Sequence, residues 1–160
     1  MEGSLKASNE IFSTSDKWAD MEIRAYPRDM LRKYTRSYVH CENVLVNPKK
    51  IIGTDHPKYI GISWRDFFCK GQRISERMKS LSVNPGYYGE CHQENSRYGG
   101  WSLVQVQGVF FIVDGNHRSI IAKRLAHQGI IQKQLIPDIV KYKLTAVGNI
   151  NFIFWRFFGS

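Results

Sequence analysis

The chain has 160 residues, of which 42% are hydrophobic and 13% are aromatic. This length suits one domain, and this apolar content is enough to form a core, which argues against a disordered chain. The sequence has no run of the roughly 18 apolar residues that span a bilayer, and no basic region followed by an apolar run at its N-terminus. We therefore expect neither a transmembrane segment nor an export signal.

The formal net charge of +9 attracts polyanions, and nucleic acid is the commonest polyanion in a cytoplasm. The basic residues gather in two segments, 24–36 and 118–143, on either side of a nearly neutral middle. The three cysteines, Cys41, Cys69 and Cys91, are odd in number and irregularly spaced, which suits reduced thiols better than a disulfide framework. We therefore predict a cytoplasmic protein with DNA among its partners.

The N-terminal part is expected to form a polar arm followed by two helices. Residues 1–15 are polar and Ser-rich, and a helical pattern starts at Asp16 and ends before Pro27, which disfavours helical backbone in the residue before it. A second helix restarts at Pro27. This helix carries an apolar stripe (Met30, Leu31, Tyr34 and Tyr38) beside a basic stripe (Arg28, Arg32 and Arg36). The basic stripe is either a solvated face or a contact with a phosphate backbone.

Several short elements are predicted in the middle of the chain. Short strands are expected at residues 44–46 and 51–53, each next to turn-forming residues. The spacing from Ser63 to Asp66 is that of a capping box at the start of a helix. A further helix is expected at residues 75–81, before a turn-forming Asn-Pro-Gly run.

The C-terminal half predicts a hairpin that leads into a helix. Val104 and Val106 alternate with glutamines, as in a half-exposed strand, and the fully apolar run 109–113 predicts a buried second strand. Apolar residues recur four positions apart over residues 118–127, which predicts a helix. Two more strands are expected, at 136–144 and at the aromatic-rich 152–158.

The corner between the buried strand and the helix has the residues of an anion site. Gly115 allows a tight turn and the close approach of a phosphate, and Asn116 can cap the helix. His117 and Arg118 add donors and positive charge to the backbone amides at the positive end of the helix dipole. Asp114 can hold a hard cation such as Mg²⁺ or orient His117. The alternative is an ordinary strand-to-helix turn.

The run Asp114-Gly115-Asn116-His117-Arg118 resembles the signature corner of the ParB/sulfiredoxin superfamily. Members include chromosome-partition proteins, sulfiredoxins, free serine kinases and plasmid fertility-inhibition proteins such as Osa. The resemblance covers residues 101–127. It implies an α/β (α+β) fold with a small mixed β-sheet and surrounding helices. Residues 1–40 would then be an arm and a helical extension packed on a domain of residues 41–160, in a protein with one domain overall.

The resemblance also implies the roles of the corner residues. The residues expected to bind ATP or another nucleotide are Gly115, Asn116, His117, Arg118 and Ser119. The expected catalytic residues are Asp114, His117 and Arg118, with Mg²⁺ on Asp114. Sulfiredoxin activity is disfavoured because Asn116 stands where those enzymes have a reactive cysteine. Sequence-specific centromere binding is disfavoured because the chain after Gly129 is too short for a helix-turn-helix reader.

The leading functional hypothesis is a metal-dependent ATPase that also cleaves DNA and acts in fertility inhibition of conjugative transfer. The residues expected to contact nucleic acid are Arg28, Arg32, Arg36, Lys123 and Arg124. One alternative is a non-catalytic inhibitor that binds nucleic acid or a component of the conjugative transfer machinery. A second alternative is a small-metabolite kinase of the free serine kinase type. Glu90 and Glu94 are weaker candidates for a second carboxylate near the corner.

Overall fold

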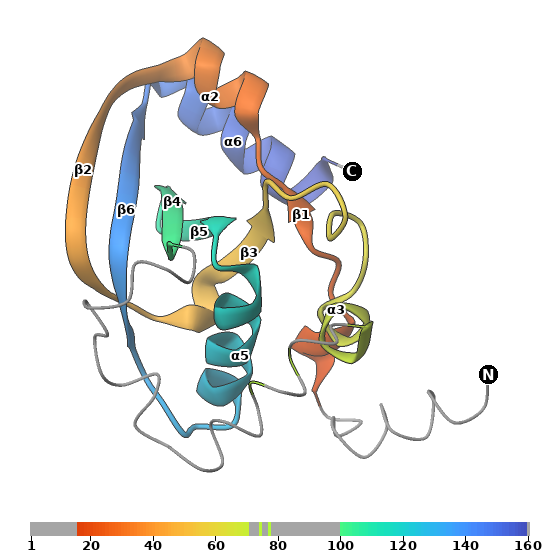
Figure 1. Ribbon diagram of the computed structural model, residues 1–160. Coiled ribbons are helices and arrows are strands. Elements are labelled where there is room, and N and C mark those ends of the chain that lie inside the picture. The colour runs from red at the N-terminus through yellow and green to blue at the C-terminus, as the bar shows by residue number, and fades with distance from the viewer. Residues whose placement is uncertain (1–15, 71–73, 75–76, 78–99, 160) are drawn as a thin grey trace.

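The computed structural model describes residues 16–70, 74, 77 and 100–159, which form a mixed α/β fold around one six-stranded sheet (Figure 1). The strands are β1 (Arg24–Ala25), β2 (Thr35–Val46), β3 (Ile51–Thr54), β4 (Ser102–Val106), β5 (Val109–Asp114) and β6 (Gln134–Leu144). Their order in the sheet is β1-β3-β5-β4-β6-β2. Neighbours β1, β3 and β5 run parallel, as do β4 and β6, whereas β4 is antiparallel to β5 and β2 is antiparallel to β6.

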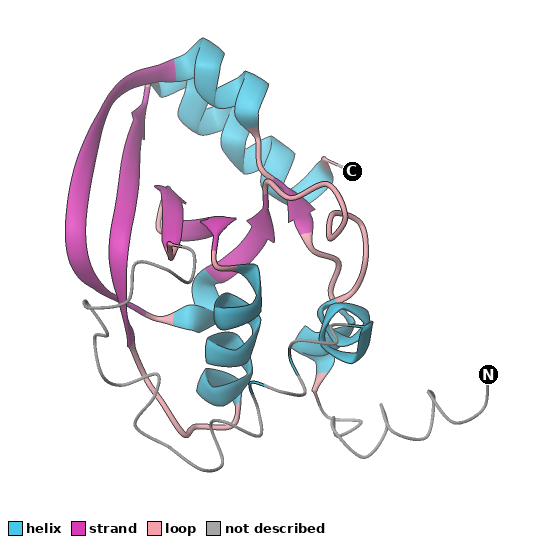
Figure 2. Ribbon diagram, in the orientation of Figure 1, coloured by secondary structure: helices cyan, strands magenta, loops and turns pink. Residues whose placement is uncertain are grey.

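Helices lie on both faces of this sheet (Figure 2). They are α2 (Arg28–Tyr34), α3 (Trp64–Lys70), α5 (Asn116–His127) and α6 (Ala146–Phe158), with short 3-10 turns η1 (Lys17–Asp20) and η2 (Pro48–Lys50). One hydrophobic cluster joins α3, α5 and η1 to one face of the sheet, and a second joins α2 and α6 to the other face. No helix of the described residues is long and apolar enough to cross a membrane.

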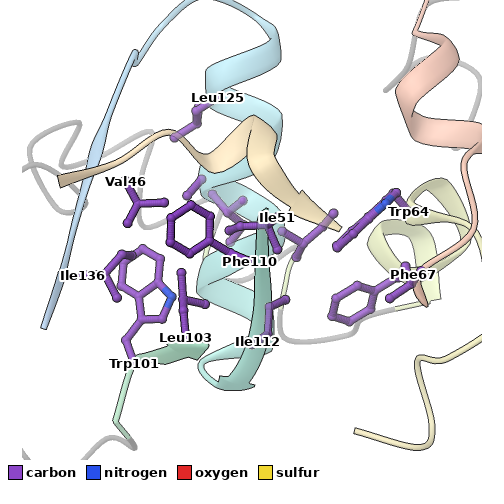
Figure 3. Packing of buried hydrophobic residues seen from close by; sticks show 14 of the residues in the cluster. Val46, Ile51, Trp64, Phe67, Trp101, Leu103, Phe110, Ile112, Leu125 and Ile136 are labelled. Carbon is purple, nitrogen blue, oxygen red and sulfur yellow. The ribbon is translucent and has the colours of Figure 1, made fainter. Parts of the chain in front are cut away.

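Strand β5 lies between these two clusters. Phe110 and Ile112 point to the cluster that contains α5, and Phe111 between them is fully buried in the cluster that contains α6 (Figure 3). A strand that is covered on both faces needs apolar residues at every position, which accounts for the unbroken apolar run in the sequence. The predicted hairpin with β4 is confirmed, and its turn residues Gln107 and Gly108 both have positive φ, at 46° and 78°.

One half of the capping box predicted at the start of α3 is present. The Ser63 hydroxyl oxygen accepts a 3.0 Å hydrogen bond from the backbone N–H of Asp66. The strand expected at 51–53 is β3, and the strand expected at 136–144 is the longer β6. The arm at residues 1–15 lies outside the described residues, as does most of the helix expected at 75–81.

The predicted N-terminal helical extension is wrong in two places. The first helix is only the η1 turn, and the chain then forms β1, which pairs with β3. The second helix ends at Tyr34, so Arg36 and Tyr38 lie on β2 rather than on α2. The apolar residues have helical spacing, but residues 35–46 form a strand because they pair with β6. This long ladder gives hydrogen-bond partners to backbone N–H and C=O groups that would lack them at the end of a short helix. The expected boundary at residue 41 therefore falls inside β2.

The aromatic segment 152–158, expected as a strand, is the last half of α6. Thr145 caps this helix, and its hydroxyl oxygen accepts a 3.1 Å hydrogen bond from the backbone N–H of Gly148. The aromatic side chains suggested β structure, but their spacing puts Phe152 in the core and Trp155 against it, one turn apart. Arg24 on β1 donates a 3.0 Å hydrogen bond to the carbonyl of Trp155, which ties α6 to the edge of the sheet.

Candidate phosphate-binding site

The candidate site lies where strands β3 and β5 end. The two strands are parallel neighbours, so the residues that follow them meet at the same edge of the sheet. Asp55 and His56 follow β3, while Gly115 follows β5, which ends on Asp114. The Asp55 backbone N–H donates a 3.0 Å hydrogen bond to the Ile112 carbonyl, which extends the contact between the two segments beyond the ladder. In open α/β sheets, ligands bind at such carboxyl ends.

Gly115 makes the sharp corner between β5 and α5. Its backbone is left-handed, with φ 80° and ψ 35°, which disfavours residues that carry a Cβ. A Cβ at this position would also lie 2.7 Å from Cδ1 of Trp101, which is too close for a real contact. Backbone conformation and the Trp101 ring therefore independently favour glycine, and the corner is held in one shape.

The first turn of α5 faces the same edge. Its first intrahelical hydrogen bond is donated by the Ser119 N–H to the Gly115 carbonyl at 2.9 Å. The amides of the three residues before Ser119 therefore point out of the helix end, where the helix dipole is positive. His117 and Arg118, both partly buried, belong to this turn. The arrangement suits a bound anion such as a phosphoryl group.

Asn116 does not cap α5, contrary to the sequence prediction. No side-chain hydrogen bond caps this helix, and the Asn116 side-chain oxygen instead accepts a 2.7 Å hydrogen bond from the Thr54 hydroxyl. The same hydroxyl oxygen accepts a 3.1 Å hydrogen bond from the backbone N–H of His56. Thr54 thus links the end of β3 to the start of α5. Asn116 has a positioning role in the structure, and direct contact with a nucleotide stays a prediction.

Two carboxylates meet at this edge. Asp114 is exposed, and its Oδ1 accepts a 2.7 Å hydrogen bond from the Gly115 N–H. The pKa of Asp55 is raised, first by partial burial and in smaller part by the negative charge of Asp114, whereas Arg28 and His56 oppose the rise. The Arg28 guanidinium lies 3.9 Å from the Asp55 carboxylate. A cation bound beside Asp55 would favour the charged form of its carboxylate.

The histidines of the site contact a small aromatic group. The His56 and Tyr59 ring centroids are 4.7 Å apart, and Tyr59 meets the edge of His117 at 6.1 Å. Phe67 of α3 lies 5.8 Å from the His117 ring, centroid to centroid. Tyr59 therefore contacts both imidazoles, and the packing of Tyr59 and Phe67 restricts the orientation of His117.

Ser119, expected to bind nucleotide, has a structural role for its side chain. The residue is fully buried, and its hydroxyl oxygen accepts a 2.9 Å hydrogen bond from Nε1 of Trp101. Its hydroxyl therefore faces the core beneath the corner and not the outer edge of the sheet. The contact holds Trp101 against Gly115, so Ser119 supports the corner from behind.

Lys123, expected to contact nucleic acid, is a buried residue of α5 with 4% of its surface exposed. Its Nζ donates hydrogen bonds to the carbonyls of Ile51 at 2.8 Å and Lys49 at 3.0 Å, and it lies 5.0 Å from the centre of the Trp64 ring. Burial lowers the pKa of Lys123 to about 7. The sequence pattern missed this position because a lysine on an amphipathic helix is normally exposed.

The other basic residues expected to contact nucleic acid are split among three elements. Arg28 and Arg32 are exposed on α2, whereas Arg36 is exposed on β2. The Arg124 guanidinium is partly buried and lies 4.6 Å from the centre of the Phe68 ring. Only the two arginines of α2 therefore form a basic helical surface, and Arg28 at its start reaches Asp55 of the site.

Sequence reasoning missed Asp55 and His56. The signal was available, since both follow a predicted strand just as Asp114 follows another, and parallel strands bring such residues together.

Within residues 16–70 and 100–159, no group of three or more His, Cys, Asp or Glu is placed to hold a metal ion. Asp55 and Asp114 supply carboxylates, the ligand type that Mg²⁺ prefers, and a Mg²⁺ ion at this edge stays a prediction. Glu90 and Glu94 lie outside the described residues.

Comparison of the chain with protein-family models, with curated proteins and with solved structures gave no match. The class that the structure defines is a mixed α/β fold around a six-stranded mixed sheet, and the candidate site lies at the end of two parallel strands of that sheet.

Proposed function

We propose that this chain is a metal-dependent phosphohydrolase that acts on a nucleotide such as ATP and also on DNA. The observation that carries the proposal is the meeting of Asp55 and Asp114 beside the first turn of α5. Carboxylates bind a hard cation, and the helix end binds an anion, so the two features together match a metal-phosphate pair. The resemblance of the corner to the ParB/sulfiredoxin superfamily supports the same function.

The reaction needs a phosphoryl group held in place and a water molecule in line with the bond that breaks. The amides of the first turn of α5 and the Arg118 guanidinium hold the phosphoryl oxygens. Mg²⁺, when bound, neutralises charge on the phosphoryl group. His117 accepts a proton from the attacking water, which forms the new P–O bond as the bond to the leaving group breaks. The products are ADP and phosphate from ATP, or a nicked strand from DNA.

DNA is proposed as a substrate because the protein is positively charged. The protein carries a formal charge of +9, and the exposed Arg28 and Arg32 lie on the helix whose first residue reaches the site. Such a surface binds phosphates without reading the base sequence. A role in fertility inhibition of conjugative transfer rests on the resemblance of the corner to plasmid proteins with that role.

The test is turnover by purified protein. ATP and supercoiled plasmid are incubated with wild type, with an Asp114→Ala, His117→Ala double variant and with Asp29→Asn, each with and without Mg²⁺. Asp29 is an exposed carboxylate on α2 and serves as the matched control. We expect wild type and Asp29→Asn to turn over substrate only with Mg²⁺. Equal turnover by wild type and the double variant refutes the proposal. Phosphoserine made from ATP and serine would favour the kinase alternative.

The second candidate function is a non-catalytic inhibitor that binds a component of the conjugative transfer machinery. It is favoured by the apolar outer side of α6. The exposed apolar residues of this helix are Val147, Ile150, Ile153, Phe154, Phe157 and Phe158. Exposed apolar side chains gathered on one helix are typical of protein contacts. Capture of such a component by the Asp114→Ala, His117→Ala variant but not by Phe157→Asp would favour this candidate.

A further inference from the structure

The segment after β3 contributes to a cluster of three aromatic rings that reaches from the core to the surface. Phe67 of α3 is 1% exposed, and its ring centroid lies 4.0 Å from that of Tyr59. The His56 ring contacts Tyr59 in turn, with the centroids 4.7 Å apart and the ring planes 33° apart. Because Tyr59 is half-buried and His56 is exposed, His56 is the outermost ring of this cluster.

The exposed His56 is held in one orientation by contacts on its backbone and on its ring. Its backbone N–H donates a 3.1 Å hydrogen bond to the hydroxyl oxygen of the buried Thr54. Its ring nitrogen Nδ1 accepts a 3.3 Å hydrogen bond from the backbone N–H of Lys58, and the ring packs on Tyr59. Exposed side chains normally change rotamer freely. A ring that is fixed in advance binds a ligand at a lower cost in entropy.

The His56 ring has a surface that is open to solvent. Among the described residues, no ring other than that of Tyr59 contacts it. Tyr59 covers one side of the imidazole, and the exposure of the residue leaves the other side accessible. A flat, fixed and accessible ring of this kind is what proteins use to stack on a nucleic-acid base.

The contacts of His56 also place it beside the first turn of α5. The Thr54 hydroxyl that accepts from His56 donates a 2.7 Å hydrogen bond to the side-chain oxygen of Asn116. Tyr59, which contacts His56, also meets the edge of the His117 ring at 6.1 Å. One aromatic ring therefore connects His56 to His117, in the same way that one ribose ring connects the base of a nucleotide to its first phosphate.

We propose that the open side of the His56 ring stacks on the base of the nucleotide whose phosphates bind at the first turn of α5. This inference rests on the function proposed above for the phosphate site, and it adds the part of the site that binds the base. The ligand is then a nucleotide with a base, and not an inorganic polyphosphate. Stacking accepts every base, because each has a π face, and purines stack best because their ring system is larger.

Two substitutions separate stacking from a polar role of His56 toward a phosphate or a metal ion. His56→Asn places an oxygen close to the position of Nδ1, so it can keep the hydrogen bond from Lys58, but it removes the ring. His56→Phe keeps a ring and removes both nitrogens. Tyr38→Ala is the matched control, since Tyr38 is a 67% exposed ring that packs on Tyr142 on β2, at the other end of the sheet from β1 and β3.

The experiment is isothermal titration calorimetry with ADP, UDP and pyrophosphate, each in the presence of Mg²⁺. ADP is a product of the proposed hydrolysis, so its binding is measured without turnover. Wild type should bind ADP more tightly than UDP and UDP more tightly than pyrophosphate. His56→Asn should weaken ADP binding by roughly 5- to 150-fold, the loss of one base–aromatic contact, and leave pyrophosphate binding unchanged. His56→Phe and Tyr38→Ala should bind ADP as wild type does.

A measurement on wild type alone covers the case in which His56→Asn fails to fold, which circular dichroism detects. In isotope-labelled protein, the ring protons of His56 should shift upfield on addition of ADP and not on addition of pyrophosphate, because a stacked base adds its ring current. An equal loss of ADP and pyrophosphate affinity in His56→Asn would overturn the proposal, since the histidine would then act on the phosphates. Unchanged ADP affinity in that variant, or absence of the upfield shift, would overturn it as well.

Failure of this inference differs from failure of the proposed hydrolysis. ADP binding that depends on the His56 ring, without ATP turnover, would refute hydrolysis alone. ATP turnover by a protein whose ADP affinity does not depend on His56 would refute base stacking alone. A wild type that binds ADP no more tightly than pyrophosphate overturns base stacking whatever its turnover.

Discussion

The Thr54 hydroxyl donates a 2.7 Å hydrogen bond to the Asn116 side-chain oxygen, and this contact joins the two strand ends that make the candidate site. Thr54 is 1% exposed, so its hydroxyl cannot exchange this bond for one with water. The hydroxyl oxygen also accepts from the His56 N–H. A single buried side chain therefore sets the position of Asn116 on α5 relative to His56 on the loop after β3.

Thr54→Val should destabilise the fold and weaken the site together. The variant keeps the shape of the side chain but removes the hydrogen-bond partner of the Asn116 oxygen and of the His56 N–H, at a cost of about 1 to 3 kcal/mol in the free energy of unfolding. Urea unfolding measures this cost. Thr54→Ser is the control, since it keeps the hydroxyl and should be much less destabilised. Equal destabilisation of the two variants would mean that the methyl group, and not the hydroxyl, matters.

Gly115→Ala tests the corner, with Gly129→Ala as its matched control. Both glycines have positive φ, at 80° and 76°, but a Cβ at Gly115 meets Trp101 at 2.7 Å, whereas a Cβ at Gly129 meets nothing within 4 Å. Left-handed backbone costs an alanine about 1 to 3 kcal/mol at either site. Gly115→Ala should therefore lower the free energy of unfolding more than Gly129→Ala, measured by chemical denaturation. Equal effects would remove the role assigned to Trp101.

Lys123 should make stability depend on alkaline pH. Burial lowers its folded-state pKa to about 7, whereas an unfolded lysine has a pKa near 10.5. Between these values the unfolded state holds a proton that the folded state lacks, so stability rises with pH, by about 1.4 kcal/mol per pH unit for this group. Below pH 7 both states are protonated and the contribution is at its lowest. The rise, followed by urea unfolding at each pH, should be absent in Lys123→Met and kept in Lys133→Met, an exposed control.

Asp55→Asn should lower turnover about as much as Asp114→Asn. Each variant removes one of the two carboxylates that are proposed to hold Mg²⁺, and removal of a metal ligand typically costs at least about a hundredfold in rate. The measurement is kcat for phosphate release against Mg²⁺ concentration, and both variants should need more Mg²⁺ than wild type. Full activity of Asp55→Asn would limit the metal site to Asp114.

Salt dependence separates residues that bind DNA from core residues. Replacing Arg28 and Arg32 by glutamine should flatten the slope of log affinity against log salt by about 0.9 for each DNA phosphate that the variant no longer neutralises. Lys123→Met should leave the slope unchanged, because its ammonium group faces backbone carbonyls in the core. Filter-binding titrations over a range of salt concentrations give the slopes. An unchanged slope in the arginine variant would mean that α2 has a solvated face and does not contact DNA.

The sequence by itself determined the unit from β4 through β5 to α5. Its signals are local: an alternating strand, a two-residue turn, an unbroken apolar strand and a glycine before an amphipathic helix. Each of these signals depends on neighbours a few residues away, so the local sequence is enough to predict the structure of this unit. The same holds for the Ser63 cap of α3.

Only the tertiary structure decided the rest, because the deciding contacts join distant parts of the chain. Arg36 lies on β2 and not in the predicted helix, because β2 pairs with β6, about a hundred residues further on. Lys123 is a core residue because the carbonyls of Lys49 and Ile51 accept hydrogen bonds from its Nζ. Asp55 joined Asp114 because β3 and β5 lie side by side. Burial and long-range pairing outweigh local preference at these positions, since each replaces contact with water by contact with a specific neighbour.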